Sequence, residues 1–135
     1  MKAHLTRRYI FSASHRLHTD RLTTEQNRAV YGKCNNPYGH GHNYALEVTV
    51  SGQVDAGTGM VCNLVDLDAA VRQQVIERFD HVNLNLLPDF AAQVPTTENL
   101  TEGIYQILKQ SFTQAHLEKV RLEETGKNSF EYDGG

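Results

Sequence analysis

The segment Lys33–Tyr44 holds the residue types that point most directly to chemistry, because it sets one cysteine ahead of two closely spaced histidines. Cys34 is followed by His40 and His42, which a single glycine separates. The residues after them alternate between apolar and polar, as in a half-buried strand, whose successive side chains point to opposite faces. His40 and His42 therefore share one face, and such a pair predicts a site for one metal ion.

A catalytic zinc ion typically has three protein ligands and an open fourth position, so a third histidine is expected nearby. His15 ends the first predicted strand and lies beside the second if the two strands pair, which makes it the preferred third ligand. His18, three residues further on in a polar segment, is the alternative. For His4, His18 and His116, each taken alone, the sequence favours an ordinary histidine without a metal.

Asp80 and His81 form a second pair with catalytic potential, directly after a predicted helix. A carboxylate beside a histidine can orient the ring and raise its basicity, which would make the pair a general base. Cys34 is a candidate for the group on which this general base acts, since a thiol becomes reactive near a histidine or a metal ion. The spacing fits equally well a structural role, because histidine is favourable at the C-terminal end of a helix.

Glu124 is a carboxylate at an apolar position of a predicted strand, because it shares the parity of Val120 and Leu122. Burying an unpaired carboxylate costs on the order of a few kcal/mol. A planar ligand with adjacent N–H donors, such as a guanidine-like edge, would satisfy it with two charge-assisted hydrogen bonds. A structural salt bridge to an arginine or a lysine is the alternative.

Apolar periodicity predicts the elements that must position these groups, in the order β-β-α-α-β-β. The strands are expected at Leu5–Ser14, about His42–Val54, Val120–Glu124 and Ser129–Tyr132, and the helices at Leu64–Phe79 and Leu100–Phe112. Thr96 and Thr97 are placed to cap the second helix. The polar segment His18–Tyr31 is expected to be a loop with a short helical turn. The pattern predicts an α+β fold, one domain over 1–135, with an antiparallel sheet and both helices on one face.

The composition of the 135-residue chain excludes several classes of partner. Its formal net charge of −3 argues against nucleic acid or an anionic membrane as the main partner. The N-terminal residues lack the apolar run of a signal peptide, and no window approaches the roughly 18 apolar residues of a membrane span. Two cysteines, Cys34 and Cys62, are too few for a disulfide framework. We therefore expect a cytoplasmic protein in which Cys34 is a free thiol.

Several motifs, in the same order along nearly the whole chain, resemble the family of 6-pyruvoyl-tetrahydropterin synthases and the related 6-carboxy-tetrahydropterin synthases. Any one of these motifs alone would be a weak match, whereas their ordered set is specific. They are Phe11–Leu17, Tyr31–Pro37, Gly39–Tyr44, Thr58–Val61 with Asn63 and Leu64, Asp80 and His81 with Leu84 and Asn85, Thr96–Asn99, and Glu124 with Thr125.

The resemblance implies a role for each candidate residue. Zn²⁺ would be bound by His15, His40 and His42. The catalytic group would be Cys34, Asp80 and His81. The pterin ring would be anchored by Glu124, with Thr96 and Thr97 nearby. The implied substrate is 7,8-dihydroneopterin triphosphate, and charge and proximity to the motifs make Arg16 and Lys33 candidate contacts for its triphosphate.

The resemblance also implies an assembly. The fold would be a tunnelling-fold (T-fold) domain, whose subunits join edge to edge into trimers that stack as homohexamers. Active sites between subunits would explain why Asp80 and His81 need not approach Cys34 within one chain.

Three alternatives to a pyruvoyl product remain open at this stage. The run Cys34–Pro37 before the paired histidines favours the pyruvoyl enzymes, and the 6-carboxy enzyme of queuosine (7-deazaguanine) biosynthesis is the nearest alternative. A non-catalytic, zinc-stabilised pterin-binding module would be expected to lack catalytic residues such as Cys34, Asp80 and His81. A structural zinc site would need a fourth protein ligand, for which Cys34 is the only plausible residue.

Overall fold

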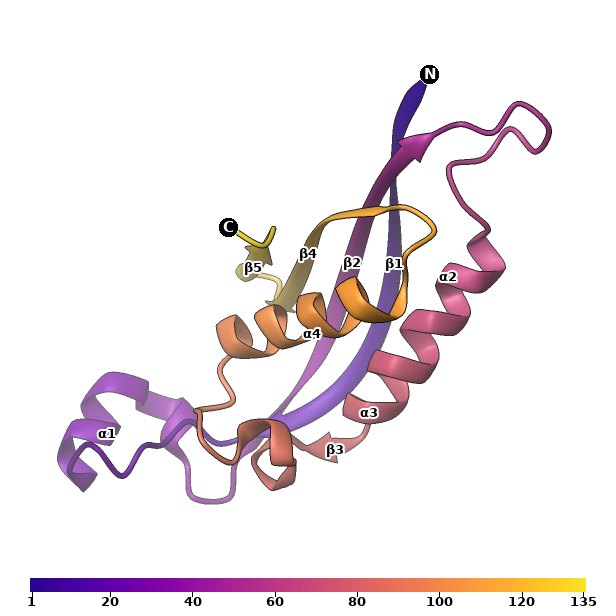
Figure 1. Ribbon diagram of the computed structural model, residues 1–135. Coiled ribbons are helices and arrows are strands. Elements are labelled where there is room, and N and C mark those ends of the chain that lie inside the picture. Colours follow the sequence, from indigo (N-terminus) through magenta and orange to yellow (C-terminus); the bar gives the residue numbers. More distant parts are fainter.

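The computed structural model describes residues 1–135 and contains a five-stranded sheet with the strand order β3-β1-β2-β4-β5. β1 pairs antiparallel with β2, β2 with β4 and β4 with β5, whereas β3 runs parallel to β1. β1 and β2 are long, curved and adjacent along the length of the molecule (Figure 1). The strand bounds are Lys2–His15 for β1, His40–Gln53 for β2, Val82–Asn83 for β3, His116–Thr125 for β4 and Asn128–Tyr132 for β5.

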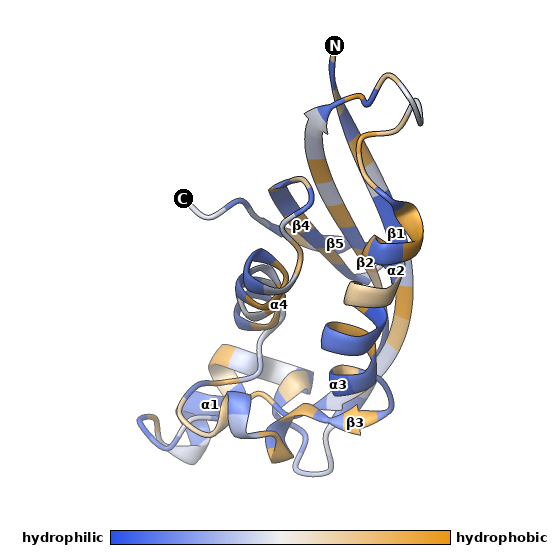
Figure 2. Cartoon of the chain, turned by 45° about the vertical axis from the view of Figure 1, so that its right-hand side comes forward, coloured by the Kyte–Doolittle hydropathy of each residue, from blue (hydrophilic) through white to orange (hydrophobic).

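The helices that cover the sheet follow the two predicted apolar stripes. α2 (Leu64–Val71) and α3 (Glu77–Phe79) are joined by the π-helical turn Arg72–Ile76, and α4 spans Thr97–Ser111. These helices lie on the same face of the sheet (Figures 1 and 2). The remaining helical segments are α1 (Thr24–Tyr31) and the short 3₁₀ turns Gly32–Asn35, Leu84–Leu86 and Pro88–Phe90.

The core lies between the helices and one face of the sheet. Alternate strand residues point into it, which is visible as the banding of apolar and polar positions along the strands in Figure 2. Phe11, Tyr44 and Leu46 from the sheet and Val75 and Ile104 from the helices are all buried in one cluster. The predicted α+β architecture with helices on one face is confirmed.

Leu100 tests the contribution of this core, because it is fully buried on α4. Leu100→Ala leaves a cavity and is expected to lower the free energy of unfolding by about 2–5 kcal/mol, as measured by urea denaturation. Leu86 is 81% exposed, so Leu86→Ala is the matched control and is expected to change stability by no more than about 0.5 kcal/mol. Equal losses in the two variants would contradict this assignment of the core.

Two elements differ from the sequence prediction. α1 is a complete eight-residue helix with a capping box, in which Thr23 and Gln26 bond each other's backbone N–H, where a loop with a short turn was expected. Its polar sequence has no apolar stripe from which periodicity could detect it. β3 is only two residues long, too short for any alternation, and adds a parallel pair to an otherwise antiparallel sheet. No helix is both long and apolar enough to cross a membrane.

Candidate functional site

Three histidines meet where the paired strands β1 and β2 come together at one end. His15 and His40 lie opposite each other in the register of the pair, and His42 shares the face of His40. One nitrogen from each ring lies within 4.8 Å of the others, and the ring centroids are 4.7 to 5.1 Å apart. The antiparallel pairing thus brings His15 to the two histidines of β2, and His18 is not part of the cluster.

The chemistry of this cluster fits a metal ion. Four buried ring nitrogens have no hydrogen-bond partner: Nε2 of His15, both nitrogens of His40 and Nε2 of His42. Because buried polar atoms are almost always paired in folded proteins, unpaired nitrogens from three rings that approach within 4.8 Å of one another fit a bound metal ion. Nδ1 of His15 donates to the carbonyl oxygen of Pro95 at 2.7 Å, which leaves the lone pair on Nε2 for a metal. Burial lowers the pKa of His15 and favours the neutral ring that metals bind.

Cys34 lines a cavity of about 1040 Å³ together with His40, His42 and Glu124. It is not a member of the group whose ligand atoms converge, which consists of the three histidines alone. Cys34 therefore lies beside the candidate metal position and does not close it. Burial, followed by the negative charge of Glu124, raises the pKa of the Cys34 thiol.

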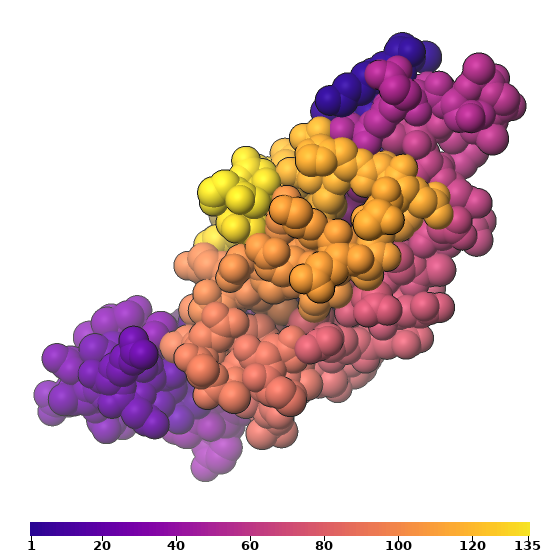
Figure 3. Space-filling model, viewed as in Figure 1, coloured from indigo at the N-terminus to yellow at the C-terminus, as the bar shows by residue number.

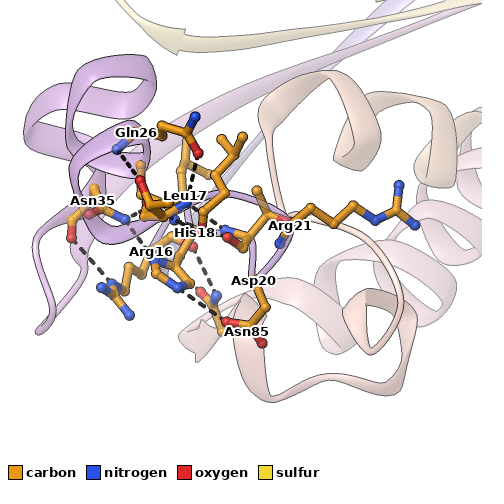
Figure 4. Close-up of polar contacts among 12 residues, drawn as sticks. Arg16, Leu17, His18, Asp20, Arg21, Gln26, Asn35 and Asn85 are labelled. Carbon is orange, nitrogen blue, oxygen red and sulfur yellow. Dashed lines mark hydrogen bonds and ion pairs between the residues drawn. The ribbon is translucent and has the colours of Figure 1, made fainter.

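The segment that carries Cys34 is fastened to the end of β1 by a network of amide contacts (Figure 4). The backbone N–H of Arg16 donates to Oδ1 of Asn85 at 2.7 Å, and the Asn85 amide donates back to the Arg16 carbonyl at 2.9 Å. The Asn35 side chain donates to the Leu17 carbonyl at 2.7 Å. The Leu17 N–H in turn donates to the Cys34 carbonyl at 2.8 Å. The two bonds from Asn35 and Leu17 hold the backbone of the Cys34 segment beside the end of β1.

Glu124 points inward, as its strand parity predicts, with 14% of its side chain exposed. Its carboxylate accepts a hydrogen bond from the Thr97 hydroxyl, and Oε1 lies 3.9 Å from Nε2 of His42 and 3.5 Å from Nδ2 of Asn128. None of its partners is an arginine or a lysine, which contradicts the alternative of a structural salt bridge. An acid without a basic partner remains available to a ligand in the cavity.

Thr96 and Thr97 have different contacts. The Thr96 hydroxyl accepts the Asn99 N–H at 3.2 Å and caps the start of α4, as predicted. Only the Thr97 hydroxyl reaches Glu124.

Asp80 and His81 do not meet Cys34 within one chain. Oδ1 of Asp80 accepts the backbone N–H of Ser12 in β1 at 2.8 Å, and Oδ2 lies 2.9 Å from Nδ1 of His81. The bond from Ser12, and then that from His81, lowers the pKa of Asp80. His81 lines a second hollow of about 370 Å³, which shares His42 with the Cys34 cavity but does not include Cys34, and 82% of the His81 side chain is exposed. The carboxylate thus orients the ring, and Asp80 is also the C-terminal cap of α3, so the pair has both of the positions that the sequence allowed.

The backbone of His81 is strained. Its φ of 59° is the only positive value at a non-glycine residue, and its N–H donates to the Ser12 carbonyl at 2.5 Å. Non-glycine residues adopt this region rarely, and such strain concentrates at functional sites. The backbone conformation of His81 thus sets it apart from every other non-glycine residue of the chain.

Two residues of the site escaped the sequence reasoning. The Tyr44 hydroxyl is buried without a hydrogen-bond partner, and burial and the charge of Glu124 raise its pKa. Tyr44 shares the strand face of His42, so strand alternation could have indicated it. Arg28 lines the cavity from α1, the helix that periodicity could not detect.

Comparison with known proteins agrees with this arrangement. Residues 4–135 match the family described as 6-pyruvoyl tetrahydropterin synthase. The 6-pyruvoyl tetrahydrobiopterin synthase of Poecilia reticulata is 48% identical over 132 residues, which cover 97% of this chain and 90% of that protein. The human enzyme of the same name is 45% identical over 134 residues, which cover 98% and 92%.

The solved structure of Caenorhabditis elegans 6-pyruvoyl tetrahydropterin synthase superposes with a TM-score of 0.95 at 39% identity, covering 100% of this chain and 97% of that one. A putative 6-carboxy-5,6,7,8-tetrahydropterin synthase of Archaeoglobus fulgidus matches less of the chain, with 35% identity over 85 residues that cover 63% of this chain and 67% of that protein. The chain has the T-fold and belongs to the 6-pyruvoyl tetrahydropterin synthase family, whose members are lyases.

Proposed function

We propose that this lyase requires Zn²⁺ and converts 7,8-dihydroneopterin triphosphate to 6-pyruvoyl-tetrahydropterin with elimination of triphosphate. The observation that carries the proposal is the cluster of unpaired nitrogens from His15, His40 and His42, which borders the same cavity as Cys34 and Glu124. The three histidines hold the ion. Bound zinc would acidify the hydroxyls of the substrate side chain and stabilise the negative charge that develops on proton removal.

The pterin ring is anchored by Glu124 in this proposal. The carboxylate accepts adjacent N–H groups of the ring, and Thr97 holds it in place through its hydroxyl. Three cationic side chains, Arg16, Arg28 and Lys33, line the same cavity and are suited to the triphosphate.

Glu124→Gln is expected to raise KM for the pterin substrate by about 10- to 100-fold, because a charge-assisted hydrogen bond of about 1.5–3 kcal/mol is weakened. Steady-state kinetics measures the change. Glu123→Gln is the matched control, since Glu123 faces away from the cavity and lies 3.7 Å from Arg8. Equal effects of the two substitutions on KM would show that Glu124 does not bind the pterin ring.

Protons are moved by Cys34 from one side and by His81, oriented by Asp80, from a neighbouring subunit. The assembly is a homohexamer, a dimer of trimers with sites between subunits. Two observations support a shared site: His81 lies outside the Cys34 cavity and is 82% exposed, and β3 and β5 are edge strands with one side unpaired. The whole chain acts as one domain. It acts in the cytoplasm, a reducing compartment, because Cys34 must remain a thiol to carry a proton.

The product distinguishes this proposal from its alternatives. Pure protein is incubated with 7,8-dihydroneopterin triphosphate, and the products are identified by mass spectrometry. Triphosphate with the pyruvoyl product supports the proposal. A carboxy product with acetaldehyde instead identifies a 6-carboxy-tetrahydropterin synthase of the queuosine pathway. Tight pterin binding without turnover identifies a zinc-stabilised binding module.

A further inference from the structure

The hydroxyl group of Tyr44 is a buried polar group that neither the core nor the proposed reaction uses. The side chain is fully buried, and its oxygen has no hydrogen-bond partner. Phe11 stacks on the ring, with centroids 5.1 Å apart and planes inclined by 18°. The core thus treats Tyr44 as an apolar ring, and a phenylalanine would fill the same space. Because buried polar groups are almost always paired, this hydroxyl is expected to pair in the working state of the site.

The strand register places this hydroxyl beside the carboxylate of Glu124. β2 pairs with β4 through Ala45 and Glu123, so the next residues, Tyr44 and Glu124, lie side by side on the two strands. Alternation along the strands points both side chains to the face that carries the core. Burial, and then the negative charge of Glu124, raises the pKa of Tyr44, as expected for a hydroxyl close to that carboxylate.

Thr97 links the hydroxyl to the carboxylate. The Thr97 side chain is buried, and its hydroxyl donates to Glu124, which leaves its oxygen able to accept a hydrogen bond. The same hydroxyl partly offsets the rise in the pKa of Tyr44, which indicates that the two hydroxyl groups are neighbours although no hydrogen bond joins them. A small adjustment of the side chains would therefore complete a chain from Tyr44 through Thr97 to Glu124.

The cavity that Glu124 lines lies toward the end of the molecule that carries α1, since Thr24 and Arg28 of that helix also line it (Figures 1 and 3). Tyr44 does not line this cavity, and its oxygen is out of reach of solvent. A ligand can therefore touch the carboxylate of Glu124 but not the tyrosine hydroxyl. Tyr44 can influence that ligand only through the residues that lie between them.

We propose that Tyr44 is a positioning residue, whose hydroxyl donates to Thr97 when a ligand binds Glu124 and thereby holds the carboxylate toward the cavity. This role rests on the proposed function in one respect, the binding of the pterin ring by Glu124. The bond from Tyr44 strengthens the bond from Thr97 to Glu124, because hydrogen bonds in a chain polarise one another. The hydroxyl is unpaired in the free protein and paired in the complex, so it contributes to binding and not to folding.

Binding of 7,8-dihydroneopterin, which lacks the triphosphate, tests this role in the full-length protein equilibrated with Zn²⁺. Tyr44→Phe is expected to raise the Kd of this pterin about 3- to 10-fold, because one hydrogen bond of the complex is lost. The free variant is expected to unfold at the same urea concentration as the unmodified protein or at a higher one, because it loses only an unpaired hydroxyl. Fluorescence titration measures the Kd, and urea denaturation measures the stability.

Tyr9→Phe is the matched control, for which the opposite pattern is expected. The Tyr9 hydroxyl donates to Oδ1 of Asp68 at 2.7 Å, and Tyr9 does not line the cavity. Loss of a hydrogen bond that is present in the free protein is expected to lower the urea midpoint and to leave the Kd unchanged. The two tyrosines thus separate a hydroxyl that serves the fold from one that serves binding.

A double variant shows whether Tyr44 acts through Glu124. If it does, Tyr44→Phe adds nothing to the rise in Kd that Glu124→Gln causes, whereas the effects of independent residues multiply. The proposal is overturned if Tyr44→Phe leaves the Kd unchanged, lowers the urea midpoint, or multiplies the effect of Glu124→Gln. If Glu124→Gln weakens binding and Tyr44→Phe does not, only the role of Tyr44 fails. If Glu124→Gln itself leaves the Kd unchanged, the binding of the pterin ring by Glu124 fails, and the role of Tyr44 fails with it.

Discussion

His42→Ala is expected to lose both zinc and activity, whereas Cys34→Ala is expected to keep zinc and lose activity alone. His42 supplies one of three buried nitrogens that converge within 4.8 Å, so its removal leaves two ligands and an open pocket. Cys34 lies outside that ligand group and borders only the cavity. Loss of a proton-transfer group typically lowers the rate by about 10²–10⁴-fold, which is the expected fall in kcat for Cys34→Ala.

The measurement pairs zinc content with turnover of 7,8-dihydroneopterin triphosphate for each variant. Cys62→Ala is the matched control, because Cys62 is also a half-buried free thiol but packs against the core. It is expected to keep both zinc and activity. Zinc loss in Cys34→Ala would show that the thiol is a fourth ligand, and the site would then be a closed structural one.

The cluster of three histidines could be predicted from the sequence because strand periodicity is strict. Alternation places His40 and His42 on one face, and antiparallel pairing of two adjacent strands brings His15 opposite His40. The inward direction of Glu124 follows from the same rule. Each of these inferences needs only the local pattern and one strand pairing.

Other parts of the site depend on contacts that no local sequence pattern indicates. Asp80 is bound to the Ser12 backbone 68 residues away, which fixes the pair at the edge of the sheet and away from Cys34. Arg28 enters the cavity on a helix without an apolar stripe.

Two inactive variants are expected to regain activity when they are mixed, provided that the active site lies between subunits. Cys34→Ala and His81→Ala are denatured together and refolded, so that their subunits mix at random. Each site takes Cys34 from one chain and His81 from another, so about one quarter of the sites in a closed symmetric assembly receive both intact residues. The recovered activity is therefore expected to approach about one quarter of that of the unmodified protein.

A mixture of Cys34→Ala with His42→Ala is the negative control for this experiment. Cys34 and His42 line the same cavity of one chain, so every mixed site still lacks one of them, and no activity is expected. Native mass spectrometry confirms in both mixtures that subunits have exchanged. If exchanged Cys34→Ala and His81→Ala subunits remain inactive, His81 does not act at a neighbour's thiol. Its strained backbone and its contact with Asp80 would then have to serve the hollow that it lines with Ser12 and Asn43.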